Sequence, residues 1–385
     1  MFKLQLYILY LLVAFTSFLT ARYLHLYQGH KDMCHVLNTQ FVEDFTAKDQ
    51  SDCLDIFAKS LTFNSWEIQM NSWLGQWGWS HLMVYAPSQT DEIWESKSVS
   101  VGVKLRYIEG NYVVLRAHPN SVFKRGDMFL TVNGEESINS SMILSDGGVY
   151  TIERAGEVLS LQVEPKEFKW DDKVEIDSPY FRVTSFRGEF FLEEDMDYFS
   201  KELKNLKVQT LYIDLRENYG GNIGAGLKFL SFFLCKNQVI GGFHVPKNEG
   251  KGETFYPQTV EQSVQIEVVK NHEFIRLEVP KSKHCYDGKV EVLVDSETSS
   301  TAEMVAMAFR EIKNTPIRGI LTSGRMVLSS WEAVKNYPEG FYYSFPYAIY
   351  TTAKGAMIES SGVFPDIERE YDLLLEKSGK DSFIQ

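Results

Sequence analysis

The stretch Val290-Glu-Val-Leu-Val-Asp-Ser-Glu-Thr-Ser-Ser-Thr-Ala-Glu-Met-Val-Ala-Met-Ala-Phe309 decides how the rest of the chain is interpreted. It opens with an apolar, largely β-branched run, Val290–Val294, which is typical of a buried strand. Small and polar residues follow. Apolar residues then resume at Ala302 with helical spacing and continue to Phe309. The pattern predicts a strand, a tight turn and a helix.

Ser300 stands at this predicted junction, next to the start of the helix. Free backbone N–H groups and the helix dipole favour negative charge there. Acyl-transfer enzymes place a nucleophile and an oxyanion hole together at such a junction. The same position suits Ser299 or Ser300 as a simple N-cap, with Glu303 closing a capping box, and that use is far commoner. On this stretch alone both interpretations stay open.

The bulk properties exclude some classes of function. The chain has 385 residues, enough for two or three domains, and its 44% hydrophobic and 24% charged content is ordinary for a globular protein. The net charge of −13 argues against nucleic-acid binding, because contact with phosphates needs a basic face. It also argues against a polybasic membrane-binding patch.

The first segment is predicted to lie outside the fold. Leu4–Ala21 is almost wholly apolar and is flanked by Lys3 and Arg22. This is the pattern of a signal peptide or of a short N-terminal membrane anchor, and both remain open because Leu19 makes a poor cleavage site. In either case the remainder is expected to be exported, so it would be periplasmic, extracellular or membrane-anchored facing outside the cytoplasm.

Export changes what the four cysteines imply. None of them has CxxC spacing, so a zinc site is not expected. In an oxidising compartment the two most local pairings, Cys34 with Cys53 and Cys235 with Cys285, are predicted to form disulfides. In a reducing compartment all four would be buried free thiols.

Composition and periodicity divide the chain after residues 1–21 into three regions. Residues 22–98 are aromatic and helical in pattern. Residues 99–166 alternate short strands with glycine-containing turns and predict a small β-rich domain. Residues 167–385 read as α/β, and within them 236–288 is polar, lysine-rich and irregular, which suggests a cap or an insertion.

The order of elements in the β-rich region resembles a PDZ domain. The matching pieces are Val101-Gly-Val-Lys-Leu105 and the late strand Tyr150-Thr-Ile-Glu-Arg154. The resemblance implies that backbone N–H groups of Val101, Gly102 and Val103 receive a carboxylate or an extended strand from a peptide.

A second strand–turn–helix pattern occurs at Asp214-Leu-Arg-Glu-Asn-Tyr-Gly-Gly221, where two glycines allow backbone N–H groups to point at a ligand. Together with Thr298-Ser-Ser-Thr-Ala-Glu303 and Gly319-Ile-Leu-Thr-Ser-Gly324, in this order, it resembles the carboxyl-terminal-processing (tail-specific) serine peptidases of family S41. The resemblance runs from about residue 75 to 367. It implies an α/β, ClpP/crotonase-like peptidase core with an inserted PDZ-like domain and a helical N-terminal region.

By this resemblance Ser300 is the nucleophile. The oxyanion hole is formed by the N–H of Thr301 and a glycine N–H from Gly220 and Gly221. Two converging donors are what a tetrahedral oxyanion needs, and losing one typically costs roughly 10²–10³ in rate. The resemblance implies no metal and no cofactor.

The chain departs from the commonest family pattern at Arg325, where the Ser–Lys peptidases carry their lysine base. Arginine cannot serve as a neutral base. The tricorn-core and nisin-resistance branches of the family use a histidine in an N-terminal string instead, which implies Ser80 and His81 here. The string from Met357 to Asp366 resembles the tricorn-type segment, so Glu359 is expected to join Ser80 and thereby orient His81.

The sequence therefore predicts an exported serine endopeptidase of the tail-specific type, acting on polypeptides, with their C-termini as one candidate target. Membrane contact is expected only through the N-terminal segment, if it is not cleaved. One alternative is a catalytically inactive, peptide-binding relative in which Arg325 marks the loss of activity. Another is a carrier of small apolar ligands built on the same fold, which would require a closed apolar pocket.

Overall fold

The computed structural model describes residues 2–108, 110–248, 250–281 and 285–368. The chain forms two compact units. The first comprises residues 1–87, 174–317 and 321–365. The second comprises residues 88–173, 318–320 and 366–385.

The N-terminal part of the first unit is helical. The helices are α1 (Phe2–Gln40), α2 (Ala47–Lys59) and α3 (Phe63–Leu74), followed by the 3₁₀ turn η1 (Gly75–Trp77) and the short strand β1 (Met83–Tyr85). The described part of the predicted leader, residues 2–21, and the residues after it up to Gln40 belong to one continuous helix. Among the described residues, no helix is both long enough and apolar enough to cross a membrane.

Capping side chains explain where α2 and α3 begin. The hydroxyl of Thr46 accepts from the N–H of Asp49, and the Asp49 carboxylate accepts from the N–H of Thr46 in return. Thr62 and Ser65 form the same reciprocal pair before α3. These caps place buried Trp66 on α3 against aromatic residues that follow β17 (Val327–Ala333).

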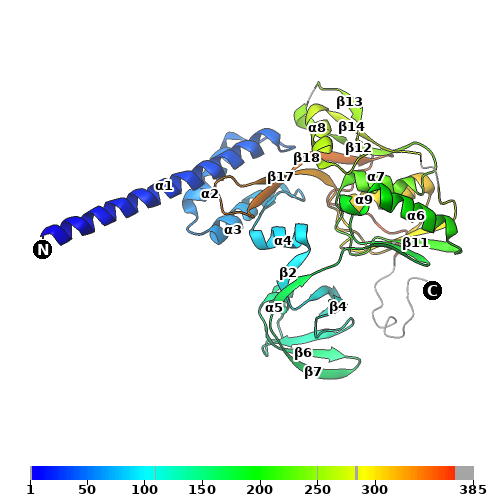
Figure 1. Cartoon of the computed structure of the whole chain (residues 1–385), viewed down its shortest axis with the longest axis horizontal. Helices are drawn as coiled ribbons and strands as arrows, with labels where there is room; N and C mark the ends of the chain where they lie inside the picture. Colours follow the sequence, from blue (N-terminus) through cyan, green and yellow to red (C-terminus); the bar gives the residue numbers. More distant parts are fainter. Residues whose placement is uncertain (1, 109, 249, 282–284, 369–385) are drawn as a thin grey trace. The chain divides into compact units, whose positions relative to one another are not determined.

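One sheet of the first unit joins the N-terminal strand to the C-terminal part of the chain. Its order is β1-β18-β12-β14-β13, with β17 also paired to β18 (Tyr342–Thr352). Strand β1 pairs antiparallel with β18, and Met83 lies opposite Ser344. Strand β18 is thus shared by elements from both ends of the sequence (Figure 1).

The segment 236–288 was expected to be irregular, and this prediction was wrong. It contains β12 (Gln238–His244), β13 (Glu253–Phe255), α8 (Gln262–Asn271) and β14 (Phe274–Val279), and β12 lies inside the sheet between β14 and β18. The lysine-rich composition concealed the period of two in β14, where Ile275, Leu277 and Val279 are buried and alternate with more exposed residues.

The second sheet of this unit contains β9 (Val174–Asp177), β10 (Tyr180–Val183), β11 (Thr210–Asp214) and β15 (Lys289–Val294). Strands β10, β11 and β15 run parallel, and β9 is antiparallel to β10. The central strand β15 is buried along nearly its whole length, as the apolar run from Val290 predicted.

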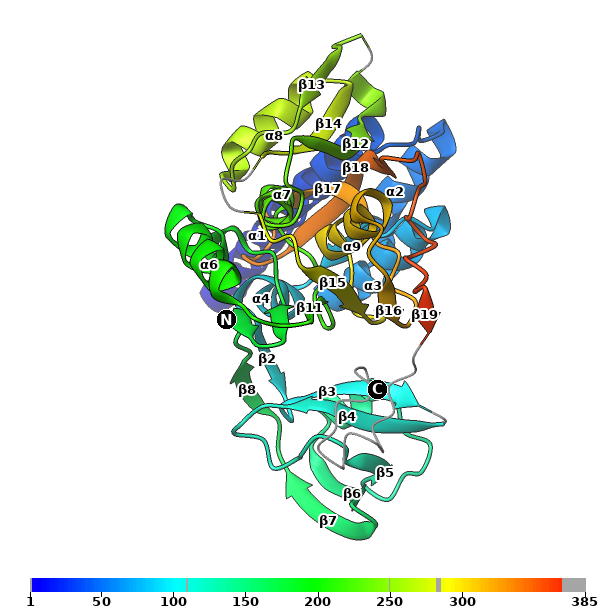
Figure 2. The ribbon, with the colours of Figure 1, turned by 90° about the vertical axis from the view of Figure 1, so that its right-hand side faces the viewer.

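Three helices accompany these sheets: α6 (Glu193–Asn205), α7 (Ile223–Ser231) and α9 (Thr301–Lys313). Helix α9 contacts β15 of one sheet and β12 and β18 of the other, so it lies between them. Residues 301–309 are all buried, which explains the apolar character of this helix on every side. Figure 2 shows α7 beside α9 in this layer.

The second unit contains a five-stranded antiparallel sheet. Its strands, in sheet order, are β3 (Val103–Ile108), β4 (Asn111–Ala117), β5 (Met128–Val132), β6 (Gly148–Arg154) and β7 (Glu157–Val163). The short helix α5 (Ser140–Ser145) lies between β5 and β6, and α4 (Pro87–Glu95) precedes the sheet in the sequence. A separate ribbon, β2 (Lys97–Ser100) with β8 (Lys166–Lys169), forms the base of this domain.

Both predicted disulfides are confirmed. Cys34 is bonded to Cys53, and Cys235 is bonded to Cys285. The first joins α1 to α2 beside the buried side chain of His30, whose Nε2 lies 2.7 Å from the carbonyl oxygen of Cys53. These three residues have metal-ligand chemistry and lie close together, but the disulfide occupies both sulfur atoms.

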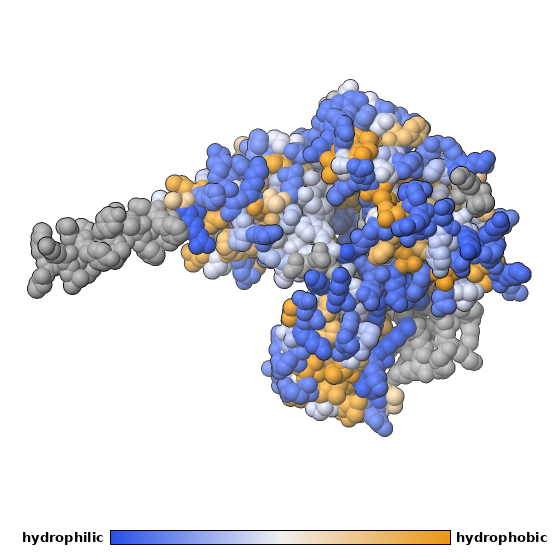
Figure 3. All heavy atoms as spheres, viewed as in Figure 1, coloured by the Kyte–Doolittle hydropathy of each residue, from blue (hydrophilic) through white to orange (hydrophobic). Residues whose placement is uncertain are grey.

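The surface has an ordinary mixture of residue types. On the face drawn in Figure 3, hydrophobic residues form scattered patches among hydrophilic ones. Such a distribution is normal for a folded chain, because apolar atoms supply much of every protein surface.

Candidate active site

Ser300 lies at the junction of β15 and α9, where the sequence pattern predicted it. It is the N-cap of α9 and has φ 56° and ψ −124°, a backbone conformation that non-glycine residues rarely adopt. The N–H of Ser300 donates to Oε2 of Glu303 at 3.0 Å. In return, the N–H of Glu303 donates to the carbonyl oxygen of Ser300 at 2.9 Å. Residues with such strained backbone conformations cluster at functional sites. The geometry therefore favours a functional role for Ser300 in addition to its role as the N-cap.

The glycine turn after β11 lies directly against the start of α9. Gly220 and Gly221 have φ values of 92° and 136°. A Cβ atom placed on Gly220 would lie 2.6 Å from Cβ of Ser300 and 3.0 Å from the backbone nitrogen of Thr301. The Thr301 hydroxyl donates to the carbonyl of Gly221 at 2.7 Å. The two predicted strand–turn–helix motifs therefore meet at Ser300.

Two backbone donors of this region have no acceptor among the described residues: the N–H groups of Gly221 and Thr301. The N–H of Gly220 is engaged inside the turn, where it donates to Oδ1 of Asn218 at 2.8 Å. Of the two glycines predicted for the oxyanion hole, Gly221 is thus the one with a donor to offer.

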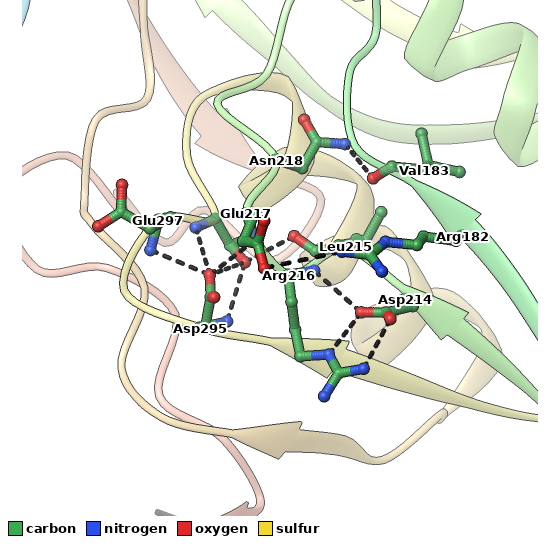
Figure 4. A network of polar contacts seen from close by, with 10 residues as sticks. Arg182, Val183, Asp214, Leu215, Arg216, Glu217, Asn218, Asp295 and Glu297 are labelled. Atoms are coloured by element: carbon green, nitrogen blue, oxygen red, sulfur yellow. Dashed lines mark hydrogen bonds and ion pairs between the residues drawn. The ribbon is translucent and has the colours of Figure 1, made fainter. Parts of the chain in front are cut away.

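The carboxylate of Asp295 joins the two turns (Figure 4). Its Oδ1 accepts from the N–H of Glu217 at 3.1 Å, and from those of Glu297 and Thr298 at 3.0 Å each. One carboxylate therefore fixes both the loop that carries the glycines and the loop that leads to Ser300. The sequence analysis did not identify this role, although an Asp whose side chain accepts from the backbone two residues on, as here from Glu297, is a known turn signal.

Asp214 and Arg216 form an ion pair at the start of the glycine turn. The guanidinium of Arg216 forms two bonds to the Asp214 carboxylate, each 2.7 Å long, and both side chains are buried. Burial raises the pKa of Asp214, but the charge and hydrogen bonds of Arg216 outweigh burial and lower the pKa overall. The pair holds the turn in place, and Figure 4 shows it beside Asp295.

Glu303 connects Ser300 to the segment that carries Arg325. Its side chain is fully buried and accepts from the N–H of Gly324 at 2.7 Å, from the N–H of Arg325 at 2.9 Å and from the hydroxyl of Thr322. Burial raises the pKa of Glu303, and these hydrogen bonds oppose the rise. The sequence predicted only its bond to Ser300.

His81 lies against the same segment. The backbone of Arg325 lies beside its ring, and the carbonyl of His81 accepts from the hydroxyl of Ser344 on β18. Burial, and then the positive charge of Arg325, lower the pKa of His81 to about 4. Among the described residues, no hydrogen bond joins the His81 ring to Ser300. Such catalytic bonds are often long before substrate binds.

Glu359 and Ser80 meet as the resemblance implied. The carboxylate of Glu359 accepts from the N–H of Ser80 at 2.8 Å and from its hydroxyl at 3.0 Å. Glu359 is buried, which raises its pKa, while the bonds from Ser80 and from the backbone of Met326 oppose the rise. The pair fixes the residue that immediately precedes His81.

The residues of the predicted peptide-binding loop belong to the second unit, where Val101 and Val103 are buried. The N–H of Val101 donates to the carbonyl of Leu144, and that of Gly102 donates to the Ser100 hydroxyl, both at 3.1 Å. The structure therefore does not leave these two donors free for a peptide carboxylate.

The pKa of His81 sets an expected pH profile. A histidine base must be neutral, and a lowered pKa keeps it neutral in more acidic solution. We expect kcat/KM for peptide cleavage to fall only as the pH drops through about 4, below the ordinary histidine value of about 6.5. Arg325→Gln should move this acid limb upward, because it removes one cause of the shift. A pH series of both proteins checks this, and a wild-type limb near 6.5 would contradict it.

Comparison with known proteins adds a match to the model of "Peptidase family S41", which covers residues 177–369, half of the chain. The chain belongs to peptidase family S41. The match spans β10, β11, β15 and α9, and so includes the glycine turn, Ser300 and Glu359.

Relatives of this S41 chain include two named "Probable CtpA-like serine protease". The one from Staphylococcus saprophyticus is 22% identical over 223 residues, which cover 56% of this chain and 39% of the relative. The one from Staphylococcus haemolyticus is 22% identical over 201 residues, with 50% and 35% covered. The chain thus matches less than half the length of these relatives.

Solved structures share the fold of this S41 chain. A photosystem II D1 C-terminal processing protease aligns with a TM-score of 0.53 and 16% identity, covering 91% of this chain and 94% of its own. Mature CPAF complexed with lactacystin aligns with a TM-score of 0.62 and 11% identity, covering 90% and 94%. At these identities the likeness concerns the fold alone, a mixed α/β architecture.

Proposed function

We propose that this protein is a serine endopeptidase that cleaves polypeptides through an acyl-enzyme. The observation that carries the proposal is the surroundings of Ser300. Its backbone conformation is strained and Gly220 packs directly against it, while in the described part of the chain the N–H groups of Gly221 and Thr301 have no acceptor. This is the arrangement that acyl transfer requires: a nucleophile next to two donors for the developing oxyanion.

In the proposed reaction His81 takes the proton from the hydroxyl of Ser300 as the oxygen attacks the peptide carbonyl. The resulting oxyanion is bound by the N–H groups of Gly221 and Thr301. His81 then gives its proton to the departing amine, and water hydrolyses the ester by the same steps. The backbone of Arg325 lies beside the ring of His81 and is one of the groups that set its pKa.

Ser80 and Glu359 act as positioning residues in this proposal. Their two hydrogen bonds fix the backbone that presents His81, whose own φ is 57°. The carbonyl of His81 is held separately by Ser344. In a serine-hydrolase triad a third residue orients the base, whatever the order of the residues in the chain.

Active-serine labelling tests the proposal. Wild-type protein is expected to react with a fluorophosphonate probe and to cleave an unfolded protein, because the probe requires an activated serine. Ser300→Ala and His81→Ala should lose both activities. Ser299→Ala is the matched control, since it removes the neighbouring hydroxyl. Wild type that neither labels nor cleaves would instead support the alternative, a non-catalytic peptide-binding protein, to which the substitution of lysine by Arg325 points.

We further propose that the enzyme is of the tail-specific type and that its β-rich domain recruits an unstructured chain end. The base of that domain offers a clean test, because Ser100 and Lys166 are register partners in β2 and β8. Replacing residues 101–165 by a short turn should abolish cleavage of long substrates and preserve fluorophosphonate labelling. Equal cleavage of long and short substrates after the excision would argue against recruitment.

We also propose that the protein is exported. Its two disulfides support this, because structural disulfides form and persist in oxidising compartments. Fractionation of the native host with an antibody to this chain tests it, and recovery in the cytosolic fraction with reduced cysteines would contradict it.

A further inference from the structure

The backbone of Arg325 is rigidly held while its side chain points outward. Its N–H donates to Glu303, and its backbone lies beside the ring of His81. The side chain itself is exposed. Among the described residues, no ion pair and no hydrogen bond engages its guanidinium. The backbone of Arg325 is fixed and its guanidinium is unpaired, so the guanidinium is available to bind a ligand.

The position of this guanidinium relates it to the predicted reaction centre. One carboxylate, that of Glu303, binds the N–H of Ser300 at 3.0 Å and the N–H of Arg325 at 2.9 Å. The backbone N–H groups of Ser300 and Arg325 therefore bind the same carboxylate and lie close together. The charge of Arg325 also acts on His81 and on Tyr85. A polypeptide held for attack by Ser300 would pass close to the segment that carries this cation.

Neighbouring carboxylates do not neutralise the guanidinium. Glu303 and Glu359 are buried, and each is satisfied by donors inside the protein. The whole chain carries a net charge of −13. An unpaired positive charge beside the site therefore has the opposite sign to the net charge of the chain. Arginine is always charged, and its planar head matches a carboxylate with two parallel hydrogen bonds.

We propose that Arg325 binds a carboxylate of the substrate next to the bond that is cleaved, so that the enzyme prefers polypeptides carrying negative charge at that place. The inference rests on the proposed peptidase function. The carboxylate is either an acidic side chain or the free C-terminus of the polypeptide, since both present the same group to Arg325.

Such binding has a chemical consequence for the base. The charge of Arg325 is one of the causes that lower the pKa of His81. A carboxylate bound to Arg325 offsets that charge, so an acidic substrate makes His81 a stronger base than a neutral substrate does. Charge recognition would therefore contribute to kcat as well as to binding.

A panel of matched peptides tests the proposal. Peptides carry Glu or Gln at each position flanking the cleaved bond, and each is made with a free or an amidated C-terminus. A charge-assisted hydrogen bond contributes about 1.5–3 kcal/mol, which corresponds to a preference of roughly 10- to 100-fold in kcat/KM. Discrimination between Glu and Gln identifies a side-chain carboxylate. Discrimination only between acid and amide identifies the chain end.

The variants assign the preference to Arg325. Arg325→Gln should bring the ratio close to one, Arg325→Lys should retain part of it, and Arg325→Glu should favour Lys over Glu at the same position. Arg276→Gln is the matched control, since it removes an exposed arginine from β14, which contributes nothing to the site. An unchanged ratio in Arg325→Gln, or equal cleavage of acidic and neutral peptides by wild type, would overturn the inference.

Binding separates this inference from the proposed function. The Ser300→Ala variant cannot cleave, so its affinity for the same peptides reports recognition alone. If wild type labels with fluorophosphonate and the variant binds acidic and neutral peptides equally, the peptidase proposal survives and the Arg325 proposal fails. If wild type does not label, but Ser300→Ala prefers acidic peptides and loses that preference with Arg325→Gln, recognition stands and catalysis fails.

Discussion

Gly220→Ala is expected to lower kcat/KM by at least about 10²–10³-fold, the cost of disabling an oxyanion hole. The added methyl would lie 2.6 Å from Cβ of Ser300 and 3.0 Å from the backbone nitrogen of Thr301. It would therefore occupy the space in front of a predicted oxyanion donor and push against the predicted nucleophile. Steady-state cleavage of a fluorogenic peptide, together with thermal unfolding, measures the effect.

The matched control for this substitution is Gly355→Ala. Gly355 has a φ of 80°, close to the 92° of Gly220, but no atom lies within 4 Å of its added Cβ. Both variants introduce the backbone strain of a left-handed residue, about 1–2 kcal/mol. Only Gly220→Ala adds the steric conflict at the site. Equal activity in the two variants would show that this turn does not border the reacting group.

Glu303→Gln is expected to lower kcat by roughly 10²-fold with a much smaller change in KM, because small displacements of reacting groups are costly. The carboxylate accepts four hydrogen bonds, from Ser300, Thr322, Gly324 and Arg325. An amide replaces one accepting oxygen by an NH₂ group that faces donors. The substitution should also lower the free energy of unfolding by about 1–3 kcal/mol, the cost of unsatisfied buried donors.

Two further variants separate positioning from general destabilisation. Glu291→Gln changes another buried glutamate, on β15, and should lose stability without a comparable loss of kcat. Glu303→Asp retains the charge and should recover part of kcat. If both glutamine variants lose kcat in proportion to their stability, Glu303 is structural only.

The sequence predicted the strands and helices around Ser300 well, because local patterns determine them. The apolar run from Val290 and the helical spacing to Phe309 correspond to β15 and α9. The disulfides were predictable because local pairings are favoured when few cysteines exist. The regular structure of the segment 236–288 was not predicted, because its polar composition hides the alternation of buried and more exposed residues within β14.

The features of the candidate site that could not be predicted from the sequence are contacts between residues that lie far apart in the chain. The spacing of Ser300 and Glu303 predicts their mutual hydrogen bond, since three residues separate N-cap from N3. Nothing local reveals that the same carboxylate also holds Gly324 and Arg325. In the sequence, Arg325 was notable only because it occupies the position of the lysine base of the Ser–Lys peptidases. In the structure its backbone supports His81 and its guanidinium remains exposed.

The pairing of β1 with β18 has a consequence for the order in which activity arises during synthesis. His81 comes early in the chain, yet its carbonyl is held by Ser344, and the preceding Ser80 is held by Glu359. A growing polypeptide that has already produced Ser300 still lacks both supports. Because non-local strand pairs form late, the proposed peptidase would stay incompetent until nearly all of its described residues had emerged. This dependence would protect the chain and its unfolded neighbours from premature cleavage during synthesis.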